Sequence, residues 1–202
     1  MRFSDFLLAL LFLFITAFVW YAHIVYLSPY YLLWFSNHIS LFIVFGILLR
    51  SKFIFTSIFC LGFLYELFWV ADFFSNVVFG FRLFGITDYL LVPGYPKFGF
   101  FAAFVHFLNP IALIYFLNKF GYHSRGYLGS IFHGAAIWLI SLIFVPKELN
   151  LNCAFANCLP ALPIPNWLWQ IAWPFITIGI IFLQFLVLKK IFKHAKSATA
   201  HL

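Results

Sequence analysis

The chain has 202 residues, of which 65% are hydrophobic, 24% aromatic and only 8% charged, and its formal net charge is +7. A water-soluble domain of this length could not cover so much apolar side chain with so little polar surface. The composition therefore excludes a soluble globular domain. It indicates an integral membrane protein of the all-α class, a polytopic transmembrane helix bundle.

The apolar residues fall into six blocks, each close to the ~20 residues that a helix needs to cross ~30 Å of hydrocarbon. Between the third and fourth blocks, glycine and proline interrupt the apolar pieces of residues 73–98. This pattern predicts an interfacial or re-entrant segment that does not cross. Because no internal repeat or linker is visible, we interpret residues 1–202 as a single transmembrane domain. The predicted spans are 6–22, 30–49, 53–72, 99–117, 127–146 and 166–188.

The basic residues predict the orientation of these spans. When loops are assigned alternately to the two sides, nine lysines and arginines fall on one side and three on the other. The positive-inside rule then predicts a multi-pass protein of the cell (inner) membrane with both termini cytoplasmic. Positive charge also suits an anionic lipid surface, so membrane lipids are the expected partners and nucleic acid is not. The nine are Arg2, Arg50, Lys52, Lys119, Arg125, Lys189, Lys190, Lys193 and Lys196, and the three are Arg82, Lys97 and Lys147.

Two cysteines, Cys153 and Cys158, lie in the loop at 147–165, which the basic residues place outside the cell. In an oxidising exterior they would form a disulfide. The alternative is a pair of reduced thiols that pack as small apolar side chains.

Polar side chains on the second, third and fourth spans reach a similar depth, about 9–12 Å below the outer surface at 1.5 Å per residue. A buried carboxylate costs several kcal/mol unless it is paired. We therefore expect Glu66 to face the bundle interior and to pair with His38 and His106. The cluster forms either a functional pocket open to the outer face or hydrogen bonds that only hold the spans together. Its members are Asn37, His38, Ser40, Glu66, His106 and Asn109, with Asp72 at the rim.

Two chemistries fit these residue types. Two histidines and a glutamate could hold zinc with an open position, but no HExxH-type local spacing is present, so we expect neither a metal nor a cofactor. The other chemistry is nucleophilic catalysis by a helix-two hydroxyl. Since His38 and Ser40 are about 200° apart on a helix, His106 is the expected base for Ser40.

Two stretches resemble the YwaF-like family of six-helix membrane proteins. They are NHISLFIVFGILL, which contains His38 and Ser40, and FVHFLNP, which contains His106. That family includes lipid acyltransferases and fatty-acid ester hydrolases. The resemblance implies a nucleophile on the second helix and a histidine on the fourth. Ser40 stands where bacterial members carry a cysteine, and His106 stands at the position of the histidine.

Most of the chain also resembles small bacterial polytopic membrane proteins that carry LW-x-x-DF and FH-x-x-LP elements, partly matched here at 67–73 and 105–110. This second resemblance implies no activity.

Three functions remain open from the sequence. A lipid-directed hydrolase or acyltransferase would use Ser40 or a water, with His106 as base and Glu66 or Asn109 as the orienting group. A small-molecule or proton-coupled carrier would use Glu66 and the histidines as a protonation relay. The third possibility is a non-catalytic membrane assembly protein.

Overall fold

The computed structural model describes residues 2–158 and 164–199, and the side chains as far as Phe192. Within these residues the chain is helical and contains no strand, which confirms the all-α helix bundle. Five helical stretches are long and apolar enough to cross a membrane, so the chain is a multi-pass membrane protein. These stretches are Phe3–Tyr26, Lys52–Val78, Lys97–Phe120, Gly126–Phe144 and Asn166–Phe192.

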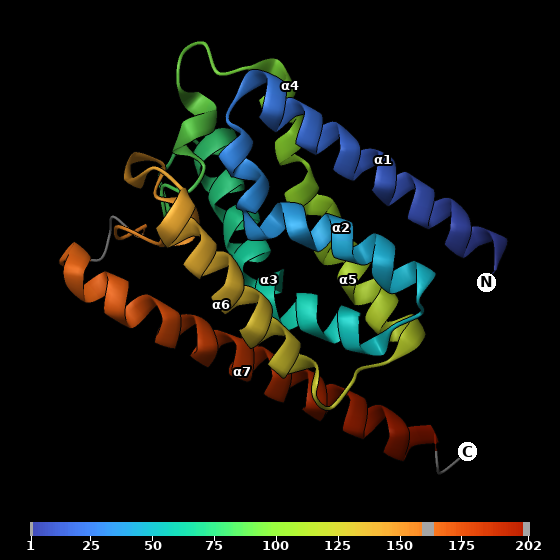
Figure 1. Cartoon of the computed structure of the whole chain (residues 1–202). Coiled ribbons are helices and arrows are strands. Elements are labelled where there is room, and N and C mark those ends of the chain that lie inside the picture. The colour runs from blue at the N-terminus through green and yellow to red at the C-terminus, as the bar shows by residue number, and fades with distance from the viewer. Residues whose placement is uncertain (1, 159–163, 200–202) are drawn as a thin grey trace.

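The helices follow one another along the chain (Figure 1), with long connections before α4 and before α7. Single turns of 3-10 helix lie at Pro29–Leu33, Asp88–Leu91, Lys147–Leu149 and Leu151–Cys153, and a π-helical turn lies at Phe74–Val78. The α-helices are α1 (Phe3–Tyr26), α2 (Phe35–Leu48), α3 (Lys52–Phe73), α4 (Lys97–Ala103), α5 (Val105–Phe120), α6 (Gly126–Phe144) and α7 (Asn166–Thr199).

The second predicted span, 30–49, divides into two parts. The 3-10 turn at Pro29–Leu33 comes first, and α2 follows with 14 residues, about 21 Å at 1.5 Å per residue. Trp34 separates them because its backbone is extended, with ψ of 138°. The helix of this span therefore begins later than predicted, directly before the polar residues of α2, and it is not among the five stretches that are long enough to cross a membrane.

Helix α3 forms the centre of the bundle and packs against α2, α5, α6 and α7 (Figure 1). Glycines allow this close approach, as is usual between membrane helices. A Cβ on Gly62 would lie 2.0 Å from Ile39 of α2, and one on Gly126 would lie 2.4 Å from Thr56. The main core joins α2, α3 and α5, and its fully buried side chains include Ile39, Ile43, Ile47, Phe55, Ile58, Leu61, Leu113 and Phe116.

The fourth predicted span, 99–117, is built from α4 and α5, with a break at Phe104. Pro110 lies inside α5 and has no N–H to donate to the carbonyl of His106. Before α4, the π-helical turn extends α3 to Val78, and residues 79–96 form a loop. As expected, the segment at 73–98 adds no crossing.

The start of α1 and the end of α7 lie at one end of the bundle, beside the connections at 49–51 and 121–125 (Figure 1). The loops at 27–34, 79–96 and 145–158 lie at the opposite end. The chain therefore traverses the bundle an even number of times. From the distribution of basic residues we propose that the end holding the termini faces the cytoplasm. The side chains of Lys193 and Lys196 lie outside the described residues.

Cys153 and Cys158 form a disulfide, with their Cα atoms 5.5 Å apart, as one of the two sequence interpretations predicted. The bridged loop is attached to α7, because the indole of Trp169 donates to the Cys153 carbonyl at 3.1 Å and that of Trp173 donates to the Asn152 carbonyl at 2.8 Å. The Asn152 amide in turn donates to a carbonyl just before α2. The loop therefore connects the start of α7 to the start of α2.

The orientation can be tested with single cysteines. Cys60 is buried and the other two cysteines are bonded, so an added cysteine is the only one expected to react. A cysteine replacing His123 should react with an impermeant maleimide only after the cells are permeabilised, whereas one replacing the exposed Arg82 should react in intact cells. Labelling of the His123→Cys protein in intact cells would contradict the proposed orientation.

The disulfide gives a second prediction. Closing so short a loop stabilises the folded chain by about 2–3 kcal/mol in the chain-entropy view. The double variant Cys153→Ser, Cys158→Ser should therefore unfold at a lower temperature in detergent, while Cys60→Ser serves as the control. Protein purified without reductant and then denatured should carry one free thiol per chain, and three free thiols would show that the bond does not form.

Candidate functional site

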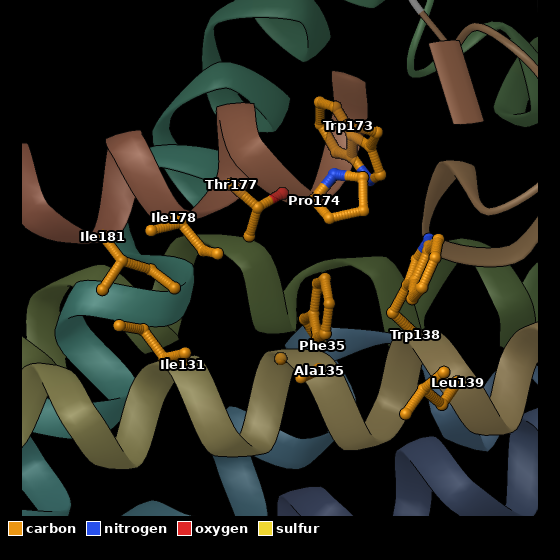
Figure 2. A pocket seen from close by; sticks show the side chains of 11 residues that line it. Phe35, Ile131, Ala135, Trp138, Leu139, Trp173, Pro174, Thr177, Ile178 and Ile181 are labelled. Carbon is orange, nitrogen blue, oxygen red and sulfur yellow. The ribbon is translucent and has the colours of Figure 1, made fainter. Parts of the chain in front are cut away.

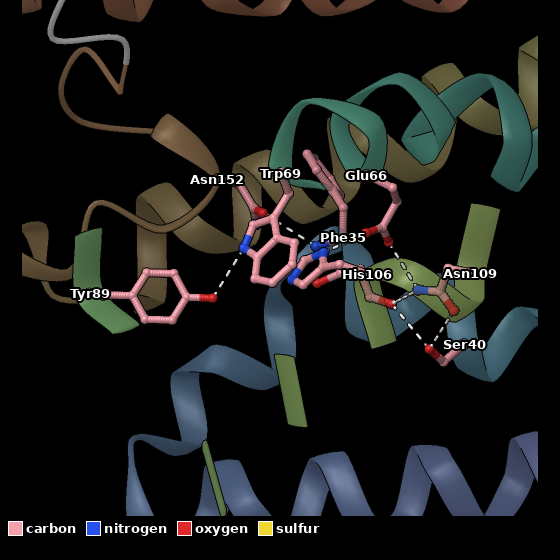
Figure 3. A network of polar contacts seen from close by, with 9 residues as sticks. Phe35, Ser40, Glu66, Trp69, Tyr89, His106, Asn109 and Asn152 are labelled. Atoms are coloured by element: carbon pink, nitrogen blue, oxygen red, sulfur yellow. Dashed lines mark hydrogen bonds and ion pairs between the residues drawn. The ribbon is translucent and has the colours of Figure 1, made fainter. Parts of the chain in front are cut away.

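The site is organised around the carboxylate of Glu66 on α3. Glu66 is only 2% exposed. One carboxylate oxygen, Oε2, pairs with Nδ1 of His106, and the other, Oε1, accepts a hydrogen bond of 2.9 Å from the Asn109 amide. His106 and Asn109 are three residues apart on α5 and therefore share a face. The predicted pairing of Glu66 with His106 is confirmed (Figure 3).

The hydrogen bonds continue from Asn109 to α2. The Ser40 hydroxyl donates to Oδ1 of Asn109 at 2.9 Å, and the Asn109 amide also donates to the Ser36 carbonyl at 3.2 Å (Figure 3). Ser36 and Ser40 are one turn apart, so both face Asn109. The hydroxyl of Ser40 therefore bonds to Asn109, and the structure does not bring it to His106 as the sequence interpretation required.

His38 is not part of the Glu66 network, and the expectation that it pairs with this carboxylate is wrong. Its Nδ1 lies 2.9 Å from Nε2 of His133 on α6, and the two rings are stacked with centroids 5.1 Å apart. The reason is the helix register, since His38 is turned about 200° from Ser36 and from Ser40. This face of α2 points to α6, whereas Ser36 and Ser40 point to α5.

The His106 ring is held in place by aromatic side chains that sequence reasoning missed. It stacks on Trp69 with centroids 4.2 Å apart and planes 14° from parallel. The Trp69 indole donates to the Tyr89 hydroxyl at 3.1 Å (Figure 3). A signal for this contact existed, because Trp69 follows Glu66 by three residues and shares its helix face.

A small cavity of about 10 Å³ borders the imidazole of His106, which is room for about one water. Its wall includes His23 on α1, another residue that sequence reasoning missed. Nδ1 of His23 lies 2.7 Å from the Val19 carbonyl. Since a carbonyl only accepts, this Nδ1 carries a proton, and in the neutral ring Nε2 has the lone pair. Asn37 also lines the cavity and donates to the Tyr31 carbonyl at 2.6 Å.

Two tyrosines of the loop at 79–96 complete the cavity wall. Burial raises the pKa of Tyr89 above its ordinary value, and it raises the pKa of Tyr95 to about 12. Both phenols are therefore protonated at neutral pH and able to donate. The cavity thus combines imidazole, amide and phenol groups beneath an aromatic cover.

Asp72 shapes the loop that carries these tyrosines. Its carboxylate accepts from the backbone N–H of Phe84, Gly85 and Thr87 at 2.6, 3.0 and 2.7 Å, and from the Thr87 hydroxyl at 2.8 Å. Asp72 is fully buried by these contacts. Asp72 therefore holds the loop at 79–96. It was predicted at the rim of the polar cluster around Glu66, but it does not line the cavity.

The pairing with Glu66 determines which ring nitrogen of His106 carries the proton. A carboxylate accepts, so Nδ1 of His106 donates to it and Nε2 of the neutral ring keeps the lone pair. None of the hydrogen bonds found in the described part of the chain involves this Nε2. Nor do three His, Cys, Asp or Glu side chains come close enough, among the residues described, to hold a metal ion. The arrangement supplies one oriented imidazole base.

No family model, curated protein or solved structure matches this chain.

The network predicts a large effect for Asn109→Ala. This change removes the bonds that Asn109 makes to Oε1 of Glu66, to the Ser40 hydroxyl and to the Ser36 carbonyl, and should destabilise the fold by about 2–4 kcal/mol. Asn118→Ala, at an exposed position of the same helix, is the matched control. Unfolding curves in one detergent measure both, and equal stability of the two variants would contradict the assigned network.

Proposed function

We propose that this protein is a membrane-embedded enzyme that acts on lipid esters, as a hydrolase or an acyltransferase, with His106 as its general base. The observation that carries the proposal is the pairing of His106 with a buried carboxylate beside a cavity. A carboxylate that orients an imidazole and stabilises its protonated form is the arrangement that activates oxygen nucleophiles in many enzymes. The resemblance to a family with lipid acyltransferases and ester hydrolases points in the same direction.

The reaction needs no nucleophile from the chain itself. Nε2 of His106 takes a proton from a water, in hydrolysis, or from an acceptor hydroxyl, in acyl transfer. The oxygen attacks the ester carbonyl carbon, and the imidazolium returns the proton to the alkoxide that leaves. Glu66 stabilises the imidazolium through Nδ1. Ser40 supports this pair through Asn109 and is a positioning residue.

The tyrosines supply the second requirement of ester chemistry, which is stabilisation of the oxyanion. The Tyr89 hydroxyl accepts from Trp69, so its own proton is left to donate. Tyr95 lines the same cavity. Because burial keeps both phenols protonated, they are the donors that we assign to the developing charge.

A proton-coupled carrier is the second candidate. Hydrogen bonds run without interruption from His106 through Glu66 and Asn109 to Ser40, as a protonation relay would require. Carriers are usually built from two similar halves with paired broken helices, and no internal repeat is visible in this sequence. In a non-catalytic assembly protein the same bonds would only hold α2, α3 and α5 together.

Replacement of His106 separates these functions. His106→Gln keeps one hydrogen bond for Glu66, so the fold should persist while lipid ester turnover in reconstituted vesicles falls by about 10²–10⁴. His133→Gln, a partly buried histidine of the other pair, should keep full turnover per folded molecule.

In a carrier the dependence is reversed, because Glu66→Gln would abolish transport while His106→Gln is tolerated. A stably folded His106→Gln protein with undiminished ester turnover would eliminate the enzyme proposal.

A further inference from the structure

A separate apolar cleft lies between α6 and α7, away from the Glu66 network. Its volume is about 170 Å³. The walls come from both helices, with Ile131, Ala135 and Trp138 on α6 facing Trp173, Thr177 and Ile181 on α7 (Figure 2). Apolar cavities of about 150 Å³ stay free of water and take up apolar molecules. The contents of this cleft should therefore be hydrocarbon.

The cleft is open to the lipid side of the bundle. Leu139 and Ile178 are part of its wall and are 50% and 41% exposed. Neighbouring side chains on the same two helices, Phe132 and Phe175, are 79% and 71% exposed and would face acyl chains in a membrane. A lipid chain can thus enter the cleft from the side.

The cleft is lined by tryptophan at one end and by isoleucine at the other, which matches the change from ester groups to hydrocarbon along a lipid. Trp138 lies in the second half of α6, which leads into the loop at 145–158, and the Trp173 indole donates to the Asn152 carbonyl of that loop. Ile131 and Ile181 lie about 10–12 Å deeper, by the rise of 1.5 Å per residue. Tryptophan is typical of the interfacial level, where the ester groups of glycerolipids lie, and isoleucine of the hydrocarbon level.

The upper end also carries a hydrogen-bond donor without a partner. The indole Nε1–H of Trp138 is buried and makes no hydrogen bond to any described residue. Since no described residue accepts from this donor, an acceptor on a bound molecule would satisfy it. The indole of Trp173, in contrast, donates to the Asn152 carbonyl, so Trp138 is the tryptophan of the cleft with a donor to spare.

We propose that this cleft binds one acyl chain of a membrane glycerolipid, with the ester carbonyl accepting from Trp138 and the chain lying between α6 and α7. The site is independent of the proposed ester chemistry at His106 and holds whether or not the protein is an enzyme.

The experiment uses the full chain in vesicles of ester-linked phosphatidylcholine that contain a trace of the same lipid with a diazirine in one acyl chain. After illumination, the labelled residues are located by mass spectrometry. Label should concentrate on the cleft, at residues such as Ile131 and Ile181, and should exceed that on the exposed Ile143. Label spread evenly over all lipid-facing helices would overturn the proposal.

Two variants test the contacts. Ala135→Phe fills the cleft and should reduce its labelling at least about fivefold, because the added ring occupies the space of the chain. Trp138→Phe keeps an aromatic ring but removes the donor, and should weaken cleft labelling about three- to tenfold, the range expected for one hydrogen bond. Ile143→Phe, outside the cleft, should change nothing. Unchanged cleft labelling in the Ala135→Phe protein would refute the site.

Ether-linked phosphatidylcholine, which has no ester carbonyl, completes the test. In the natural protein the ester lipid should label the cleft more strongly than the ether lipid, and Trp138→Phe should remove the difference. Equal labelling by both lipids in the natural protein would overturn the assigned role of Trp138.

Discussion

The structure depends on the need to pair one carboxylate inside an apolar bundle. Glu66 is 2% exposed, and an unpaired charge at such a position would cost several kcal/mol. Its two oxygens are partnered by His106 and Asn109 from the first turns of α5. Asn109 then reaches Ser36 and Ser40 on α2. Pairing a single residue of α3 thus fixes the register of three helices, and it leaves one imidazole nitrogen unused beside a cavity.

The surroundings of this pair hold it in one geometry. Trp69, one turn from Glu66, stacks on the imidazole and is itself fixed by Tyr89. Tyr89 belongs to a loop that the carboxylate of Asp72 holds through backbone N–H groups. The two acidic residues of α3 therefore have different tasks. Glu66 orients the base, and Asp72 orients the cover of the cavity, which is why both occur in a helix that is otherwise almost entirely apolar.

The fold class and part of the site could be predicted from the sequence. Five of the six apolar blocks correspond to helices that are long enough to cross a membrane, and the depth of residues along the predicted spans brought Glu66, His106 and Asn109 together. The partner of His38 could not be predicted, because the choice between Glu66 and His133 depends on how α2 is rotated, which its apolar pattern does not define. The same holds for Ser40, whose hydroxyl faces Asn109. The contribution of Tyr89 was hidden because a single 3-10 turn within the long loop at 79–96 brings it to the cavity.

The central claim is that Glu66 holds the proton of His106 on Nδ1 and leaves Nε2 free to act as a base. Nitrogen-15 NMR of the ring nitrogens of His106, in protein labelled at histidine and assigned with the His106→Gln variant, tests this claim directly. In the neutral ring, Nδ1 should carry the proton and Nε2 should carry none. A spectrum with the proton on Nε2 and a bare Nδ1 would contradict it, because Glu66 would then be the protonated partner and His106 would have no lone pair to offer the cavity.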